Sequence, residues 1–140
     1  MTGMLVDTDI LVYAYLAGPP DERAKRAKET VAGAIRSGSG FLSAQNLAEF
    51  SRFHLRRASP SVPPGVLRDI VADLEASFTV LRPSGRTVKD ALAAVERHRL
   101  PFWDAMLWAV AKENGVDEVL TEDLPPSPVI EGVRYRNPLA

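Results

Sequence analysis

The segment that most constrains the fold is Met4-Leu5-Val6-Asp7, in which three apolar residues run directly into an acid. An apolar helix-forming stretch, Ile10-Leu11-Val12, follows at once. A short apolar run of this kind is typical of a strand that is buried on both faces in a parallel sheet. In open α/β sheets, ligands bind at the edge formed by the carboxyl ends of the strands. The segment therefore predicts an α/β protein with Asp7 as a candidate functional carboxylate.

Short apolar runs alternate with helical patterns along the rest of the chain. Strands are predicted at residues 4–6, 41–43, 78–81 and 118–121, and a fifth at 133–135. Helices are predicted at residues 10–16, 22–37 and 45–57, from Pro63 onward, between Ser84 and Leu100, and after Pro101. Alternating strands and helices imply right-handed crossover connections. Because 140 residues suit one domain with its own core, we expect a single domain, residues 1–140. Its fold is predicted to be a three-layer α/β/α arrangement with a mostly parallel four- to five-stranded sheet.

Composition limits the kinds of site and location. The absence of cysteine excludes disulfides and thiolate metal sites, so a metal would need oxygen ligands or the two histidines. A net charge of −1 argues against a generally basic coat for nucleic acid. No apolar run is long enough to span a bilayer, and the first residues lack the pattern of a signal peptide. We therefore expect a cytoplasmic protein with no membrane partner.

Four acids lie where this topology would bring them to one edge of the sheet. Asp7 and Asp123 directly follow the first and fourth predicted strands, and Glu49 lies within about two helical turns of the second. Asp104 lies in the first turn of the most apolar helix. Gathered carboxylates repel one another unless a cation holds them ionised. Mg²⁺ suits such oxygen ligands and leaves positions open for phosphate oxygens, which favours metal-assisted phosphodiester hydrolysis.

Each acid also has a simpler explanation. Asp7 could be present simply as a helix cap, without any catalytic role. Asp104 lies in the first turn of a helix, where a negative charge is favoured by the helix dipole whatever its function. Glu49 could pair with Arg52 one turn further on, and Asp123 could be a turn residue. These explanations account for each acid alone but not for their convergence.

Several segments together identify a family resemblance. The segments are Asp7-Thr8-Asp9-Ile10-Leu11-Val12-Tyr13-Ala14, Ser43-Ala44-Gln45-Asn46-Leu47-Ala48-Glu49-Phe50, Phe102-Trp103-Asp104-Ala105-Met106, Leu120-Thr121-Glu122-Asp123-Leu124, Glu131-Gly132-Val133 and Asn137-Pro138. They resemble PIN-domain ribonucleases of the VapC toxin type, in the order and with the spacing of that family. Any one segment would be a weak signal, but the first four together form a specific one.

The resemblance implies an endoribonuclease that depends on Mg²⁺ or Mn²⁺ and acts as the toxin of a type II toxin–antitoxin pair. Its partners would be an RNA substrate and a small cognate antitoxin, in a homodimer or a toxin–antitoxin assembly. By motif position, Asp7 and Asp104 are the principal metal ligands and Asp123 is the fourth acid. Glu49 would bind metal directly or through water.

One further position supports the resemblance, and one position and one loop depart from it. Thr121 matches a hydroxyl position two residues before the last acid, where it would hold a water or a carboxylate. Asp9 departs from the asparagine or small polar residue that the family more often shows, so its charge would strengthen metal binding or only cap the helix. Residues 125–128 contain three prolines and form a stiffer loop than the family pattern suggests.

Contacts with RNA are predicted on one helix. Glu49, Arg52 and Arg56 fall at i, i+3 and i+7, so two guanidinium groups could lead away from the acids toward phosphates, although such a stripe is more often a solvated face. Trp103 could stack on a base, but we expect Trp103 and Trp108 in the core or an interface. For His98, in a basic cluster, we expect a surface role.

Two other classes of function fit parts of the same sequence. Asp7-Thr8-Asp9, with Glu122-Asp123 as later acids, is similar to haloacid-dehalogenase-like small-molecule phosphatases, but Ile10-Leu11 stands where that family has Gly-Thr. A receiver module would need an aspartate after the third strand, where Leu81-Arg82-Pro83 stands. A non-catalytic PIN adaptor for RNA or protein remains an alternative, although its loss of activity would be expected to remove an acid.

Overall fold

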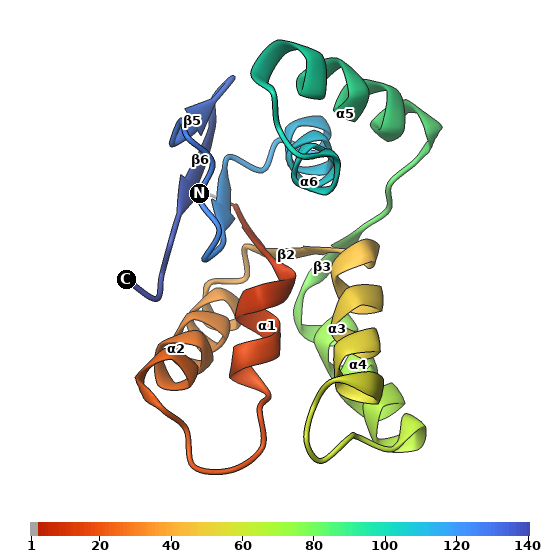
Figure 1. Cartoon of the computed structure of the whole chain (residues 1–140), viewed down its shortest axis with the longest axis vertical. Helices are drawn as coiled ribbons and strands as arrows, with labels where there is room; N and C mark the ends of the chain where they lie inside the picture. The colour runs from red at the N-terminus through yellow and green to blue at the C-terminus, as the bar shows by residue number, and fades with distance from the viewer. Residues whose placement is uncertain (1–2) are drawn as a thin grey trace.

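The computed structural model describes residues 3–140, which form a sheet between two layers of helices (Figure 1). The strands are β1 (Met4–Val6), β2 (Gly40–Ser43), β3 (Thr79–Leu81), β4 (Glu118–Leu120), β5 (Val129–Ile130) and β6 (Val133–Arg136). They lie in the order β3-β2-β1-β4-β6-β5, and every neighbouring pair is parallel except β5 and β6. The predicted mostly parallel α/β/α fold is confirmed. The expected strand number is one too low, because the two-residue β5 is too short to show a periodic pattern.

Helices cover both faces of the sheet, and each face has its own core. On one side lie α1 (Thr8–Ala14), α2 (Glu22–Ser37), α3 (Ala44–Arg56) and α4 (Pro64–Ser77), and on the other lie α5 (Gly85–His98) and α6 (Phe102–Glu113) (Figure 1). Leu5 belongs to the core under α5 and α6, whereas Val6 belongs to the core under α1 to α4. Because successive strand side chains point to opposite faces, β1 is buried on both sides, as its apolar sequence predicts.

Capping residues set the starts of the helices that surround the site. Asp7 is the N-cap of α1 and accepts a hydrogen bond from the Thr8 backbone N–H, so this helix begins two residues before the predicted position. Ser43 and Asn46 form a capping box at the start of α3, in which each side chain bonds the other's backbone. Pro64 occupies the first turn of α4, where its missing N–H is tolerated.

The helix α6 is the most deeply buried, as its uniformly apolar sequence predicts. All residues from Ala105 to Ala111 are buried. Its first turn carries Trp103 and Asp104 to the edge of the sheet where β1 and β4 end. The position of Asp104 is therefore fixed by a helix that packs against the core along most of its length. No helix formed by residues 3–140 combines the length and the apolar character that crossing a bilayer requires.

Candidate active site

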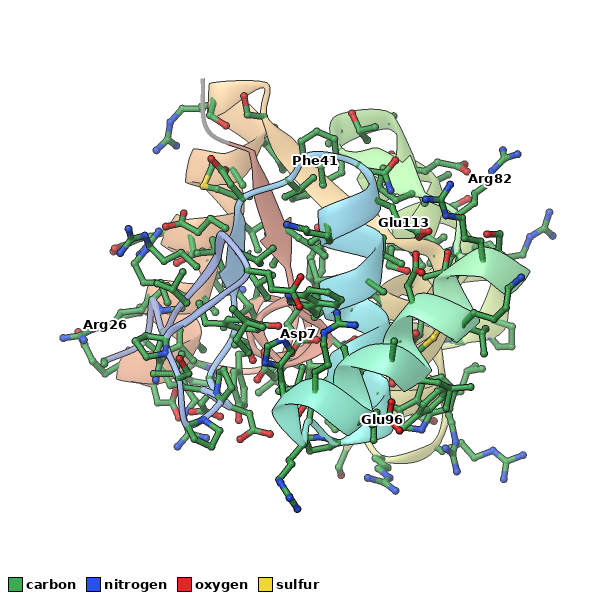
Figure 2. All side chains as sticks on the ribbon, turned by 90° about the horizontal axis from the view of Figure 1, so that it is seen from above. Asp7, Arg26, Phe41, Arg82, Glu96 and Glu113 are labelled. Carbon is green, nitrogen blue, oxygen red and sulfur yellow. The ribbon has the colours of Figure 1, made fainter. Side chains whose placement is uncertain are left out.

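A cavity of about 440 Å³ opens where β1, β2 and β4 end. In the view of Figure 2, Asp7 lies near the middle of the molecule, whereas Arg26 and Arg82 lie at its periphery. The side chains around the cavity come from α1, α3, α6 and the segment after β4. The structure thus brings together all four acids that the topology placed at this edge, together with Asp9: the cavity is lined by Asp7, Asp9, Glu49, Asp104 and Asp123.

Asp7 lies at the carboxyl end of β1 and is held by fixed donors. Its Oδ1 accepts the Thr8 N–H at 2.7 Å, and its Oδ2 accepts the Thr121 hydroxyl at 2.9 Å. Burial and then the negative charge of Asp9 raise the pKa of Asp7 to about 7, with a smaller contribution from Glu49. A carboxyl in this position gives up its proton readily only when a positive charge is nearby.

Thr121 and Asp9 join α1 to the segment after β4. The buried Thr121 hydroxyl lies 2.9 Å from Asp7 Oδ2 and 3.3 Å from Asp9 Oδ2, and it accepts the Asp123 N–H at 3.1 Å. Asp9 Oδ2 also accepts the Glu122 N–H at 3.0 Å. Asp9 is therefore not the N-cap of α1, a role that Asp7 fills. Its carboxylate instead fixes the chain that carries Asp123, and burial raises its pKa.

Glu49 and Asp123 form the exposed side of the cavity. Glu49 Oε1 accepts the Thr8 hydroxyl at 2.8 Å, and the Thr8 oxygen accepts the Asn46 side-chain N–H at 3.1 Å. The alternative expectation, an ion pair between Glu49 and Arg52, is not found among residues 3–140. Glu49 is thus oriented by a hydroxyl and not neutralised by a cation.

Asp104 is the acid that α6 contributes. Its side chain is partly buried at the start of the helix, opposite α1 and α3. Burial raises the pKa of Asp104, and the negative charges of Asp123 and Glu49 raise it further. The acids from three segments therefore act electrostatically on one another, as carboxylates that share one site must.

The donor set of the cavity fits a hard divalent cation. Its polar lining consists of carboxylates, the Thr8 and Tyr13 hydroxyls and the side-chain amides of Gln45 and Asn46, without histidine. Within residues 3–140, no three His, Asp or Glu side chains already surround one point at ligand distance. Binding an ion therefore requires rotation of side chains, for which the exposed Glu49 and Asp123 have the most freedom.

A comparison with protein families identifies the fold that carries this site. Residues 4–124 match the model of the PIN domain. The chain belongs to the PIN-domain family. This match removes the haloacid-dehalogenase-like alternative, because the first acid and its neighbours belong to a different fold. No curated protein matches the chain by sequence.

Solved structures show the same PIN fold over nearly the whole chain. A toxin–antitoxin complex from Klebsiella pneumoniae has a TM-score of 0.71 at 17% identity and covers 97% of this chain and 98% of its own. DNA-bound VapBC from Salmonella typhimurium has a TM-score of 0.68 at 17% identity, with 99% of both chains covered. VapC20 from Mycobacterium tuberculosis, a toxin that cleaves the sarcin–ricin loop, has a TM-score of 0.66 at 21% identity and covers 84% of this chain and 87% of its own.

The two tryptophans of this PIN domain have different surroundings. Trp108 is buried, and its Nε1 donates to the Ile130 carbonyl at 3.1 Å. Trp103 is 60% exposed and lines the cavity beside Asp104. The predicted core position is therefore confirmed for Trp108, whereas Trp103 lies outside the core with its indole at the mouth of the cavity.

The arginines that lie near the cavity are not all those predicted from the spacing of Glu49, Arg52 and Arg56. Arg52 and Arg57 line a second hollow of about 240 Å³, to which Thr8 and Glu49 also contribute. Arg56 lines neither hollow. Arg57, the C-cap of α3, thus takes the place beside this hollow that the helical spacing predicted for Arg56. Contact of Arg52 and Arg56 with RNA stays a prediction.

Neither histidine lines the acid cavity. His54 is buried between Phe50 and Phe53, where burial lowers its pKa. His98 bonds the Glu131 carboxylate at 2.7 Å on the surface, as expected for a residue in a basic cluster.

One network beside the cavity was missed by the sequence analysis. The Tyr13 hydroxyl donates to Glu122 Oε1 at 2.6 Å. Arg23 lies over the Tyr13 ring, 4.9 Å from its centroid, and 3.4 Å from Glu122 Oε2. These contacts tie α1 and α2 to the segment that carries Asp123. The available signal was weak: Tyr13 lies one helical turn after Asp9 and therefore faces the same way.

Proposed function

We propose that this PIN domain is a metal-dependent endoribonuclease. The observation that carries the proposal is the convergence of acids from α1, α3, α6 and the β4 segment on one cavity lined by oxygen donors. A bound Mg²⁺ or Mn²⁺ supplies Lewis acidity and a water with a lowered pKa. Oxygen ligands of this kind select such cations over softer ones.

The position of each residue in the cavity suits it to a particular role in this proposal. Asp7 and Asp104, on the buried strand end and the buried helix, are the principal ligands in this proposal. Asp123 completes the set from the exposed side. Glu49, oriented by Thr8, binds the ion directly or positions the attacking water for in-line hydrolysis of the phosphodiester, which leaves 5′-phosphate and 3′-hydroxyl ends. Thr121 keeps Asp7 in place.

Two side chains are suited to hold the RNA. The exposed indole of Trp103 stands beside Asp104, where a base could stack on it while its phosphate lies over the acids. Arg52 lies beside Glu49 and offers a charge for a neighbouring phosphate. Together they would offset the repulsion between RNA and the acidic cavity.

The proposed biological role is that of a toxin in a type II toxin–antitoxin pair. It is supported by the near-complete coverage of chains from a toxin–antitoxin complex and from VapBC. A small antitoxin would then be the inhibitor and partner, the toxin would form a homodimer or join a toxin–antitoxin assembly, and both would act in the cytoplasm. A short reading frame beside the gene would support this role.

The deciding experiment is cleavage of total RNA by the purified protein, with and without Mg²⁺ or Mn²⁺, followed by mapping of the ends. Asp104→Asn should fold normally and lose cleavage. Asp69→Asn, an exposed acid on α4, is the matched control and should cut at the wild-type rate. Cleavage by Asp104→Asn at the wild-type rate would overturn the proposal, and metal-independent RNA binding without cleavage would favour a PIN adaptor.

A further inference from the structure

The hydroxyl of Tyr135 is a buried polar group that lacks a hydrogen-bond partner among residues 3–140. The side chain is 7% exposed and packs in the core under α5 and α6. Leaving a buried hydroxyl unpaired is costly, and most such groups in proteins bind another group or an ordered water. The position of this hydroxyl therefore needs an explanation.

The surroundings of Tyr135 connect the core to the acid cavity. Tyr135 lies on β6 opposite Val119 of β4 and faces α6. It lines a small hollow together with Asp7, Asp104, Asp123 and Thr121, and Leu100, Leu107 and Pro125 form the apolar part of the wall. Burial and then the negative charges of Asp104 and Asp7 raise the pKa of Tyr135, which is consistent with a hydroxyl close to both carboxylates.

The size of the hollow limits what it can hold. Its volume is about 10 Å³, which is the space that one water molecule needs. The carboxylates of Asp7, Asp104 and Asp123 and the hydroxyls of Thr121 and Tyr135 line it, so a water there would have the polar partners that buried waters require.

We propose that Tyr135 is a positioning residue that holds one water molecule between its hydroxyl and the carboxylates of Asp7 and Asp104. The hydroxyl donates to the water oxygen, and the two water hydrogens go to the two carboxylates. Asp7 and Asp104 are thereby linked from the core side, which leaves their remaining lone pairs directed at the larger cavity. The water follows from the hollow alone, whereas its effect on metal binding rests on the proposed function.

The first test uses metal-free protein and Tyr135→Phe, with Tyr15→Phe as a control that lies outside the hollow. A high-resolution crystal structure should show the water in the wild type and not in Tyr135→Phe. In urea denaturation, Tyr135→Phe should unfold at a lower urea concentration than the wild type, and Tyr15→Phe should not. Removal of a merely unpaired hydroxyl would instead leave the midpoint unchanged or raise it. That result, or an empty hollow in the wild-type crystal, would overturn the proposal.

The second test is calorimetric titration with Mn²⁺. Tyr135→Phe should bind Mn²⁺ roughly tenfold more weakly than the wild type, the usual scale for loss of a group that orients ligands. Tyr15→Phe should bind like the wild type. Equal affinity in Tyr135→Phe would overturn the positioning role. If the wild type binds no Mn²⁺, the proposed function fails, while the water and the urea midpoint still decide the role of Tyr135.

Discussion

The two sides of the acid cavity are built differently. On the inner side, Asp7 and Asp9 are partly buried and accept hydrogen bonds from backbone N–H groups and from Thr121. On the outer side, Glu49 is exposed and bonds only the Thr8 hydroxyl, and the Asp123 carboxylate has no hydrogen bond within the described part of the chain. The inner carboxylates are fixed before any ligand arrives, whereas the outer ones are free to move onto it. The difference indicates a site with a rigid half and an adaptable half.

The largest expected effect comes from neutralising the inner side. Asp7→Asn keeps the shape of the side chain but removes its charge, so metal-dependent cleavage of RNA should fall by more than about a hundredfold, beyond the usual effect of losing an orienting group. Glu49→Gln, on the adaptable side, should lose only about tenfold. Initial rates on one RNA substrate give both values. Equal losses in the two variants would contradict the division into a rigid and an adaptable half.

The inner side should also make stability depend on pH. Between the ordinary aspartate pKa of 3.8 and about 7, the folded protein keeps the Asp7 proton that the unfolded chain has lost. Raising the pH through this window therefore favours unfolding, by up to about 4 kcal/mol in the free energy of unfolding. Urea denaturation of metal-free wild type and Asp7→Asn at pH 5 and pH 8 covers about two pH units of this window and should show a difference of about 3 kcal/mol. The same pH dependence in both proteins would show that folding does not raise the pKa of Asp7.

A smaller effect should follow from removing the hydroxyl that ties the inner side together. Thr121→Val leaves Asp7, Asp9 and the Asp123 N–H without their common partner, so the cleavage rate should fall by roughly tenfold. Thr121→Ser keeps the hydroxyl and should retain most of the activity. If valine and serine behave alike, the hydroxyl does not position the inner carboxylates.

The smallest effect is expected at the mouth of the cavity. Trp103→Ala should weaken binding of RNA by about 1 kcal/mol, the lower end of the range for stacking on one base. Leu92→Ala, which truncates an exposed apolar residue on α5, is the matched control. Binding is measured by fluorescence anisotropy in the Asp104→Asn background, so that cleavage does not interfere. Equal affinities for the two alanine variants would remove Trp103 from the RNA site.

The features that the sequence predicted are those with a local signal. The apolar run before Asp7 predicts a buried strand, and the uniformly apolar sequence of α6 predicts a buried helix, each from a few neighbouring residues. Their arrangement then follows from the rules of parallel sheets, which is why the convergence of the acids was predictable. The family resemblance added Thr121 as a supporting residue. Its hydrogen-bond partners Asp7 and Asp9 are more than 110 positions away, so no local pattern predicts them.

The features that were missed depend on distant contacts. Tyr13 and Glu122 are 109 positions apart, and nothing near either residue indicates the other. The sequence also does not predict that the buried Tyr135 hydroxyl lacks a hydrogen-bond partner among residues 3–140. A tyrosine in an alternating strand indicates only that its ring packs against the core. The exposure of Trp103 depends on how far α6 extends past the edge of the sheet, which the hydrophobic pattern alone does not determine.

The central place of β1 in the sheet has a consequence for synthesis of the protein. Met4 pairs with Gly40 on one side and with Glu118 on the other. The strand β1 is therefore synthesised well before β4, which is one of its two partner strands. A nascent chain that stops before β4 carries Asp7, Glu49 and Asp104 and can pair β1 with β2, but it lacks β4 and the segment that brings Asp123 to the cavity. The acid cavity is therefore complete only after β4 and the segment after it have emerged from the ribosome.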